Sequence, residues 1–226
     1  MKRSKQASWT SCEGTIVTGE NDMRSIKQIW LTGCVCALSL HVCATQAAQL
    51  RAAVVDEAGA PVPDAVVYAV PVGAQASAAK HAKAIIDQIK RRFVPLVSVV
   101  QTGTAVSFPN RDNIEHDVYS FSPAKRFELH LYHGIPAKPV VFDKPGLVVM
   151  GCNIHDQMIA YLLVVDTPWF AKTDARGQAA IDGLPAGAYR MTVWHYRMTE
   201  PARLPSRDIA ADAAEPAAFK LRLKSE

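Results

Sequence analysis

Runs of apolar residues along the chain predict a protein that is mainly β. The stretches Leu147–Met150 and Ile159–Val165 are apolar and rich in β-branched residues, and Pro145-Gly146 precedes the first of them. Runs of this length next to turn residues are typical of strands. The same criteria predict further strands at Ala52–Val55, Ala65–Val70, residues 94–101 and 104–108, Phe127–Leu131, Pro139–Phe142 and Tyr189–Trp194. In the tail, Phe219–Lys224 alternates apolar with basic residues, which is typical of an edge strand.

One segment has the spacing of a helix. Within Ala74–Arg92, the residues Ala82, Ile85, Ile86 and Ile89 fall on one face at helical spacing, and charged residues fall elsewhere. We therefore expect one short helix, with its basic residues either solvated or forming a docking patch.

The first 48 residues are predicted to be a leader. From Met23, a basic start precedes an apolar run from Ile29 to about Ala44, and small residues follow, with cleavage near Ala47 or Ala48. This is the layout of a secretory signal peptide, so we expect a periplasmic protein. Residues 1–22 are polar and are interpreted as a start-site artefact. A lipobox-like stretch ending at Cys34 lies too close to Met23 for a lipoprotein signal, which favours placing Cys34 within the apolar core of the leader.

Removal of the leader changes the cysteine count and leaves little net charge. Four of the five cysteines lie within it, and only Cys152 remains. A lone cysteine in an exported protein is a liability, an intermolecular link or a metal ligand. The leader also takes 5 of the 25 basic and 3 of the 21 acidic residues, which leaves a net charge of +2. Such a charge gives no strong field for nucleic acid or an acidic membrane.

The loop between the two apolar runs presents metal-binding side chains. Cys152, His155 and Met158 offer a thiolate, an imidazole and a thioether, and His116 lies upstream as a second imidazole. Two imidazoles and a thiolate in a trigonal arrangement, with a weak axial thioether, suit copper that cycles between Cu(I) and Cu(II). We predict a mononuclear copper site with the ligands His116, Cys152, His155 and Met158.

These motifs resemble those of the cupredoxins, the blue copper proteins. The resemblance covers about residues 93–165 and includes Asn110–His116, the Lys144-Pro145-Gly146 turn and the Cys152-x-x-His155-x-x-Met158 loop. It implies a Greek-key β-sandwich that transfers single electrons. The whole chain is similar to exported cupredoxin-domain proteins labelled methylamine utilization proteins. That similarity implies a c-type cytochrome or a periplasmic dehydrogenase as the redox partner.

The segments on either side resemble another β-sandwich. Residues 50–72 and 173–193 are similar to the opening and closing motifs of transthyretin-like or carboxypeptidase-regulatory-like modules. We therefore divide the chain into a leader (1–48), a first flanking β segment (49–75), a copper domain (76–166) and a second flanking segment with the tail (167–226). Whether the flanking segments form their own domain or complete the sheets of the copper domain is left open.

Two departures from the cupredoxin pattern concern the axial ligand. Asp117 follows the first histidine where many small cupredoxins have Asn, and only two residues separate His155 from Met158. Asp156 or water is therefore an alternative axial ligand to Met158. Each ligand taken singly also has a structural alternative, because free cysteine and methionine are common core residues.

Other polar residues have weaker claims to a role. His130 and His133 fall on opposite faces of a predicted strand and are expected to be solvated. His195, between two aromatic residues, is expected to pack in the core or at its rim, and the alternative is an exposed imidazole that faces a partner. Asp112 and Glu115 are candidates for orienting the His116 loop through hydrogen bonds.

No nucleophile–base pair, phosphate-binding glycine loop or zinc-hydrolase motif is present, so we do not expect an enzyme. The predicted function is one-electron transfer in the periplasm. The alternatives are a copper storage or delivery protein, and a metal-free structural or ligand-binding β-sandwich.

Overall fold

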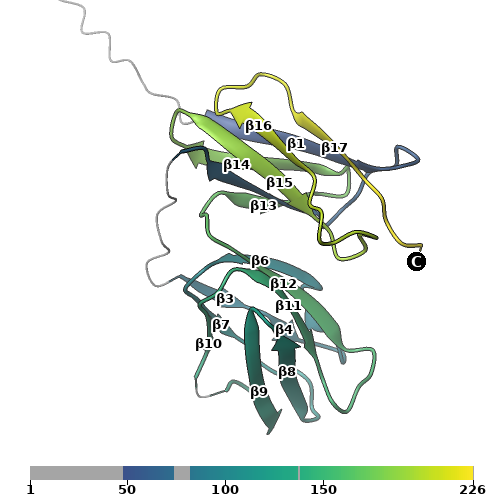
Figure 1. Cartoon of the computed structure of the whole chain (residues 1–226). Coiled ribbons are helices and arrows are strands. Elements are labelled where there is room, and N and C mark those ends of the chain that lie inside the picture. The colour runs from purple at the N-terminus through teal and green to yellow at the C-terminus, as the bar shows by residue number, and fades with distance from the viewer. Residues whose placement is uncertain (1–47, 74–81, 137, 226) are drawn as a thin grey trace, which may run out of the picture. The chain divides into compact units, whose positions relative to one another are not determined.

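The structure is a computed structural model that describes residues 48–73, 82–136 and 138–225, and this part of the chain is all β. It contains seventeen strands and no helix among the described residues, which confirms the mainly β prediction (Figure 1). The predicted leader lies almost wholly outside the described residues, apart from Ala48, which begins the first strand. Within the described residues, no helix is long and apolar enough to cross a membrane.

One β-sandwich is built from the two ends of the described chain. Its strands are β1 (Ala48–Asp56), β2 (Val66–Pro71), β13 (Phe170–Lys172), β14 (Gln178–Leu184), β15 (Ala188–Trp194), β16 (Ser206–Ala210) and β17 (Ala217–Leu221). They form two sheets with the orders β14-β1-β17 and β13-β2-β15-β16. Alternate side chains of both sheets, such as Val54, Val67 and Met191, are buried in one shared core, as period-2 strands require.

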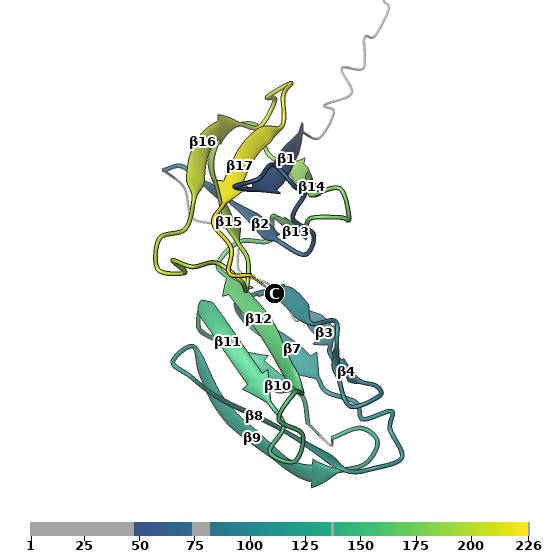
Figure 2. The same ribbon diagram turned by 90° about the vertical axis from the view of Figure 1, so that its right-hand side faces the viewer.

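A second β-sandwich lies between these segments in the sequence. Its strands are β3 (Lys83–Ile85), β4 (Asp87–Gln88), β5 (Phe93–Val94), β6 (Val97–Gln101), β7 (Thr104–Ser107), β8 (His116–Ser122), β9 (Lys125–Tyr132), β10 (Val140–Phe142), β11 (Gly146–Gly151) and β12 (Ile159–Val165). A five-stranded sheet, β6-β12-β11-β8-β9, packs against a three-stranded sheet, β10-β7-β3, and Figure 2 shows β11 and β12 in one layer with β7 and β10 in the other. β4 and β5 form a separate pair. Val118 and Leu162 of the larger sheet and Val106 and Phe142 of the smaller one share its core.

The strand order of the larger sheet brings together residues that are distant in sequence. After β9 the chain crosses to the opposite sheet as β10 and returns as β11 beside β8, where Gly151 pairs with Tyr119. A Cβ atom at Gly151 would lie 2.9 Å from Tyr119 Oη, so a larger residue here would require the Tyr119 ring to shift. β11 and β12 pair down to Gly151 and Ile159, which closes the 152–158 loop at the end of the sheet where β8 begins.

The helix prediction is wrong for the described residues 82–92. β3 pairs in parallel with β7, and Ile86 N–H donates to Ser107 O at 3.0 Å. Burial alternates along this segment: Ile86 and Gln88 are buried, whereas Ile85 and Ile89 are exposed. Pairing with a distant strand overrides the local helical spacing, because it satisfies the backbone and buries every second side chain. Residues 74–81 of the predicted helix lie outside the described residues.

Of two other strand predictions, one is confirmed and one is divided into two shorter strands. The strand predicted over residues 94–101 is divided into β5 and β6, because Pro95 has no N–H to donate to a continuous ladder. The predicted edge strand in the tail is confirmed as β17, which lies at the edge of its sheet and pairs in parallel with β1. Phe219 and Leu221 are buried and Lys220 is exposed, so the alternation seen in the sequence places the basic residue in solvent.

Candidate metal centre

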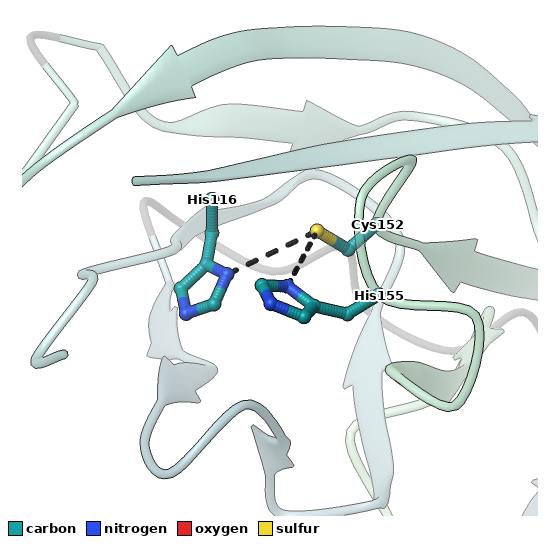
Figure 3. Close-up of side chains that lie close together, drawn as sticks. All are labelled: His116, Cys152 and His155. Atoms are coloured by element: carbon teal, nitrogen blue, oxygen red, sulfur yellow. Dashed lines mark hydrogen bonds between the residues drawn. The ribbon is translucent and has the colours of Figure 1, made fainter. Parts of the chain in front are cut away.

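Three of the four predicted ligands converge at the end of the larger sheet. Cys152 Sγ lies 3.9 Å from His116 Nδ1 and 3.8 Å from His155 Nδ1. The three donor atoms all lie within 4.8 Å of one another, and Figure 3 shows both rings turned toward the sulfur. Cys152 and His116 are buried, and His155 is half-buried. Two strand ends and one loop thus place a thiol and two imidazoles around one point.

The spacing of these atoms fits a single metal ion between them. Metal–sulfur and metal–nitrogen bonds of about 2.3 Å and 2.0 Å, set 120° apart, separate the two donor atoms by about 3.7 Å. The sulfur–nitrogen distances of 3.8 and 3.9 Å are close to this value. The donor set of one soft thiolate and two imidazoles suits copper, as the sequence predicts.

A carboxylate orients the first histidine. His116 Nε2 lies 2.9 Å from Asp112 Oδ2, and the imidazole is completely buried. A hydrogen bond from Nε2–H to the carboxylate leaves the lone pair of Nδ1 facing Cys152. Metal-binding histidines commonly use such a partner to select the tautomer and ring orientation. The orienting role predicted for Asp112 therefore has a direct contact, whereas Glu115 is exposed.

The other side of Asp112 is held by the turn between β4 and β5. The backbone N–H groups of Lys90 and Arg91 donate to Asp112 at 2.6 and 2.8 Å. Both residues have positive φ, at 53° and 58°, and successive amides in such a turn form a concave anion site. Burial raises the pKa of Asp112, but hydrogen bonds from Arg91, His116 and Lys90 outweigh it and hold the pKa below its usual value. Asp112 is thus a fixed carboxylate between this turn and His116.

A second carboxylate braces the cysteine loop. Asp117 Oδ1 accepts the backbone N–H of Asn153 at 2.7 Å, and Oδ2 accepts its side-chain amide at 2.5 Å. Asp117 therefore ties the start of β8 to the residue after Cys152. Burial raises the pKa of the Cys152 thiol, and the hydrogen bond and charge of Asp117 raise it further, against backbone N–H groups that lower it.

A buried hydrogen-bond network lies behind His116. Tyr132, which pairs with His116 across β8 and β9, donates from its hydroxyl to Phe108 O at 2.6 Å. Gln88 Nε2 donates to both Phe108 O and the Tyr132 hydroxyl. Asn110 Nδ2 donates to the backbone carbonyl oxygens of Ile114 and Tyr132. Burial raises the pKa of Tyr132 to about 12, so its hydroxyl remains protonated. The network secures the chain on either side of the first histidine.

Met158 belongs to the same part of the core but is not among the three converging donors. Its side chain is 1% exposed and packs in the hydrophobic cluster that contains Cys152. Its backbone N–H donates to His155 O at 2.9 Å, which closes the loop into a tight turn. Asp156, the alternative axial ligand, is exposed. Met158 is therefore buried in the cluster that also contains Cys152, and axial coordination by Met158 stays a prediction.

The remaining histidines lie outside the centre. His130 and His133 are exposed on and just after β9, as expected for solvated residues, and His130 Nδ1 lies 3.4 Å from Glu128. His195 is buried against Tyr196, with ring centroids 4.5 Å apart, as expected for a packing role. Burial, together with the nearby Arg197, lowers the pKa of His195 to about 4, so the ring is neutral near pH 7.

Sequence reasoning missed the backbone amides of Lys90 and Arg91, the side chain of Asn153, and Tyr132. The amides leave no signal in the residue types, because any residue but proline supplies an N–H. Asn153 and Tyr132 are common polar residues whose partners depend on strand register. The sequence pointed to a supporting role for Asp112 and Glu115, and it marked Asp117 only as a departure from the cupredoxin pattern.

Comparisons of the sequence with protein-family models and with curated proteins gave no match. Solved structures show partial likenesses. A copper-containing nitrite reductase from Thermus scotoductus SA-01 is 24% identical over 42% of this chain and 25% of that chain, with a TM-score of 0.36. A purple cupredoxin from Nitrosopumilus maritimus is 21% identical over 37% of this chain and 99% of that chain, with a TM-score of 0.32. An oxidized amicyanin variant is 19% identical over 43% of this chain and 99% of that chain, with a TM-score of 0.34. This chain thus spans about a quarter of the nitrite reductase, and an assignment of function depends on its own residues.

Proposed function

We propose that this protein binds one copper ion at His116, Cys152 and His155 and carries single electrons between redox partners in the periplasm. The observation that supports this most directly is the convergence of Cys152 Sγ with the Nδ1 atoms of both histidines at 3.8–3.9 Å. A thiolate and two imidazoles in a buried setting form the equatorial ligand set of an electron-transfer copper site. Met158 is the proposed axial ligand.

The surrounding residues would keep the ligands in one arrangement through both oxidation states. Copper, when bound, would supply the one-electron Cu(I)/Cu(II) couple. Asp112 holds the His116 ring, and Asp117 holds the loop that follows Cys152. Burial of Cys152 and His116 excludes water from the donor atoms. A site that is fixed before the electron arrives needs little rearrangement when the charge of the metal changes.

The electron would leave through the part of the site that reaches the surface. His155 is the one half-buried residue of the three, so its ring edge is the shortest path to a partner. We propose a c-type cytochrome or a periplasmic dehydrogenase as that partner. This follows from the resemblance to exported cupredoxin-domain proteins of the methylamine utilization type, and it makes the protein a carrier rather than an enzyme.

The test is the visible absorption spectrum of the protein loaded with Cu(II), beside a Cys152→Ala control. An intense thiolate-to-copper charge-transfer band in the wild type, absent from the control, is the expected result. Repeated bleaching by ascorbate and recovery with ferricyanide would then distinguish an electron carrier from a storage or delivery protein. Absence of both the band and tightly held copper would overturn the proposal.

A further inference from the structure

A cleft opens on the surface beside the exposed edge of His155. It has a volume of about 640 Å³, and its lining includes His155 and Met158 of the metal loop, Leu96 and Ile159. Leu96 is 38% and Ile159 40% exposed, so the lining offers apolar area as well as the imidazole. Apolar surface around an electron exit allows close, dry contact with a partner.

The lining of this cleft also has a basic part. Lys90, Arg91 and Arg92 are consecutive, exposed and part of the lining. No carboxylate of the described residues lies within salt-bridge distance of these three side chains, whereas neighbouring Arg111 pairs with Asp87 at 2.9 Å. One carboxylate, Asp156, also lines the cleft. The carboxylate nearest to the turn, Asp112, faces the backbone amides rather than the basic side chains.

The backbone of this basic turn has a strained conformation for residues other than glycine, asparagine and aspartate. Ile89 and Arg92 exchange backbone hydrogen bonds of 2.9 and 3.2 Å around Lys90 and Arg91, which both have positive φ. Two-residue hairpin turns with this conformation normally use Asn-Gly or Asp-Gly, because other residues are strained there by about 1 kcal/mol or more each. Long cationic residues at these two positions, next to a candidate electron exit, indicate that their charge serves a purpose other than turn formation.

We propose that this cleft and its basic turn form the docking surface for a redox protein with an acidic face. The acidic face would meet Lys90, Arg91 and Arg92, and an apolar contact would cover Leu96, Ile159 and the edge of His155. This inference rests on the proposed function, since it assigns the partner of the same site. Complementary charge at such a surface speeds association by about 10- to 1000-fold at low ionic strength.

The experiment uses one haem protein in two charge states: mitochondrial cytochrome c, which is lysine-rich and basic, and its succinylated form, which is acidic. The Cu(I) protein is mixed with each ferric form at low ionic strength, and the second-order rate of electron transfer is measured. We expect the succinylated form to react about tenfold faster or more. The difference should disappear near 1 M salt, because the Debye length then falls to about 3 Å and charges farther apart no longer attract.

A pair of matched variants locates the effect. Lys90→Gln/Arg92→Gln should slow the reaction with succinylated cytochrome c by about fivefold or more. Arg126→Gln/Lys144→Gln removes the same two residue types from exposed positions and should change it by less than about twofold. Arg126 pairs with Phe121 near the β8–β9 turn and Lys144 precedes β11, both at the end of the sheet away from the metal loop. Equal slowing by both pairs, or faster reaction with native cytochrome c, would overturn the proposal.

A binding measurement separates this proposal from the proposed function. Nuclear magnetic resonance shifts of the metal-free protein, titrated with succinylated cytochrome c, should concentrate at residues 90–92, 96, 155 and 159 and weaken in the Lys90→Gln/Arg92→Gln variant. Shifts spread over the whole surface, or their absence, would reject the docking surface even if copper gives the expected absorption band. A localised response without that band would retain the docking surface and reject the copper site.

Discussion

Asp117 and Asn153 are joined by two hydrogen bonds that tie the first histidine strand to the cysteine loop. The carboxylate accepts the backbone N–H at 2.7 Å and the side-chain amide at 2.5 Å. Asp117→Ala should destabilise the protein by about 2 kcal/mol, because two hydrogen bonds to a charged group are lost. Asp117→Asn should cost less than about 1 kcal/mol, since its amide can accept one bond while the Asn153 amide turns over.

Urea unfolding of the metal-free protein measures both free energies. Asp143→Ala is the control, because this exposed carboxylate on the same sandwich has a single ion pair among the described residues, with Lys125. The free energy of unfolding of Asp143→Ala should remain close to that of the wild type. Equal losses for the Ala and Asn variants would contradict a role based on accepting hydrogen bonds.

Asp112 should set both the affinity for copper and its reduction potential. In Asp112→Asn the new NH2 group faces the Lys90 N–H if the oxygen keeps the Oδ2 position, or the Arg91 N–H and His116 if it does not. Either orientation sets donor against donor and removes the negative charge, so the hold on His116 weakens. Comparable changes behind metal-binding histidines lower affinity by about 10- to 100-fold. The potential should rise, because a less polarised imidazole stabilises Cu(II) less.

Competition with a copper chelator and spectroelectrochemical titration measure these two quantities. Glu115→Gln is the matched control, since it removes one negative charge from an exposed residue beside the same histidine. If Asp112→Asn and Glu115→Gln shift the potential equally, net charge rather than the orientation of His116 explains the effect.

Met158 is predicted to tune the potential from the axial position. Met158→Leu should raise the reduction potential and Met158→Gln should lower it, because a thioether lies between a non-ligand and an oxygen donor in its preference for Cu(II). Met158→Leu nearly conserves volume and should cost less than about 1.5 kcal/mol of stability. Met150→Leu repeats the change at an equally buried methionine in β11. A purely packing role would leave the potential unchanged in all three variants.

His195 should make the protein less stable as the pH falls from 6.5 to about 4. Its pKa lies near 4 in the folded state, against an ordinary value of 6.5, so in this range the unfolded chain binds a proton that the folded protein excludes. The contribution of the neutral His195 ring to the free energy of unfolding is therefore fully present above pH 6.5 and decreases as the pH approaches 4. The decrease is at most about 3 kcal/mol, and smaller where solvent screens the ring.

Urea unfolding at several pH values should show a flatter profile between pH 6.5 and 4 for His195→Gln than for the wild type. His133→Gln, at an exposed histidine, is the control and should keep the slope of the wild type. A slope unchanged in His195→Gln would show that other groups account for the acid sensitivity.

The segment around Ile85 shows where sequence patterns fail. The spacing of Ile85, Ile86 and Ile89 is helical, yet Ile86 is buried while Ile85 and Ile89 are exposed, because the segment pairs with residues about twenty positions later. Local spacing carries no information about such a partner. Pro95 is the converse case, since its missing N–H is a local property that the sequence states directly.

The sequence by itself determined the donor types and the short-range part of the centre. Cys152 and His155 are three residues apart in one loop between two apolar strands, so their proximity follows from chain connectivity. The mainly β fold followed from short apolar runs, rich in β-branched residues and next to turn residues, which are a property of each strand separately. Tertiary structure alone decided the rest. It placed β8 beside β11, which brings His116 to Cys152, and it supplied the amides of Lys90 and Arg91 to Asp112. These contacts join segments 20 to 40 residues apart, and they depend on strand order and register, which arise from the packing of the whole sandwich.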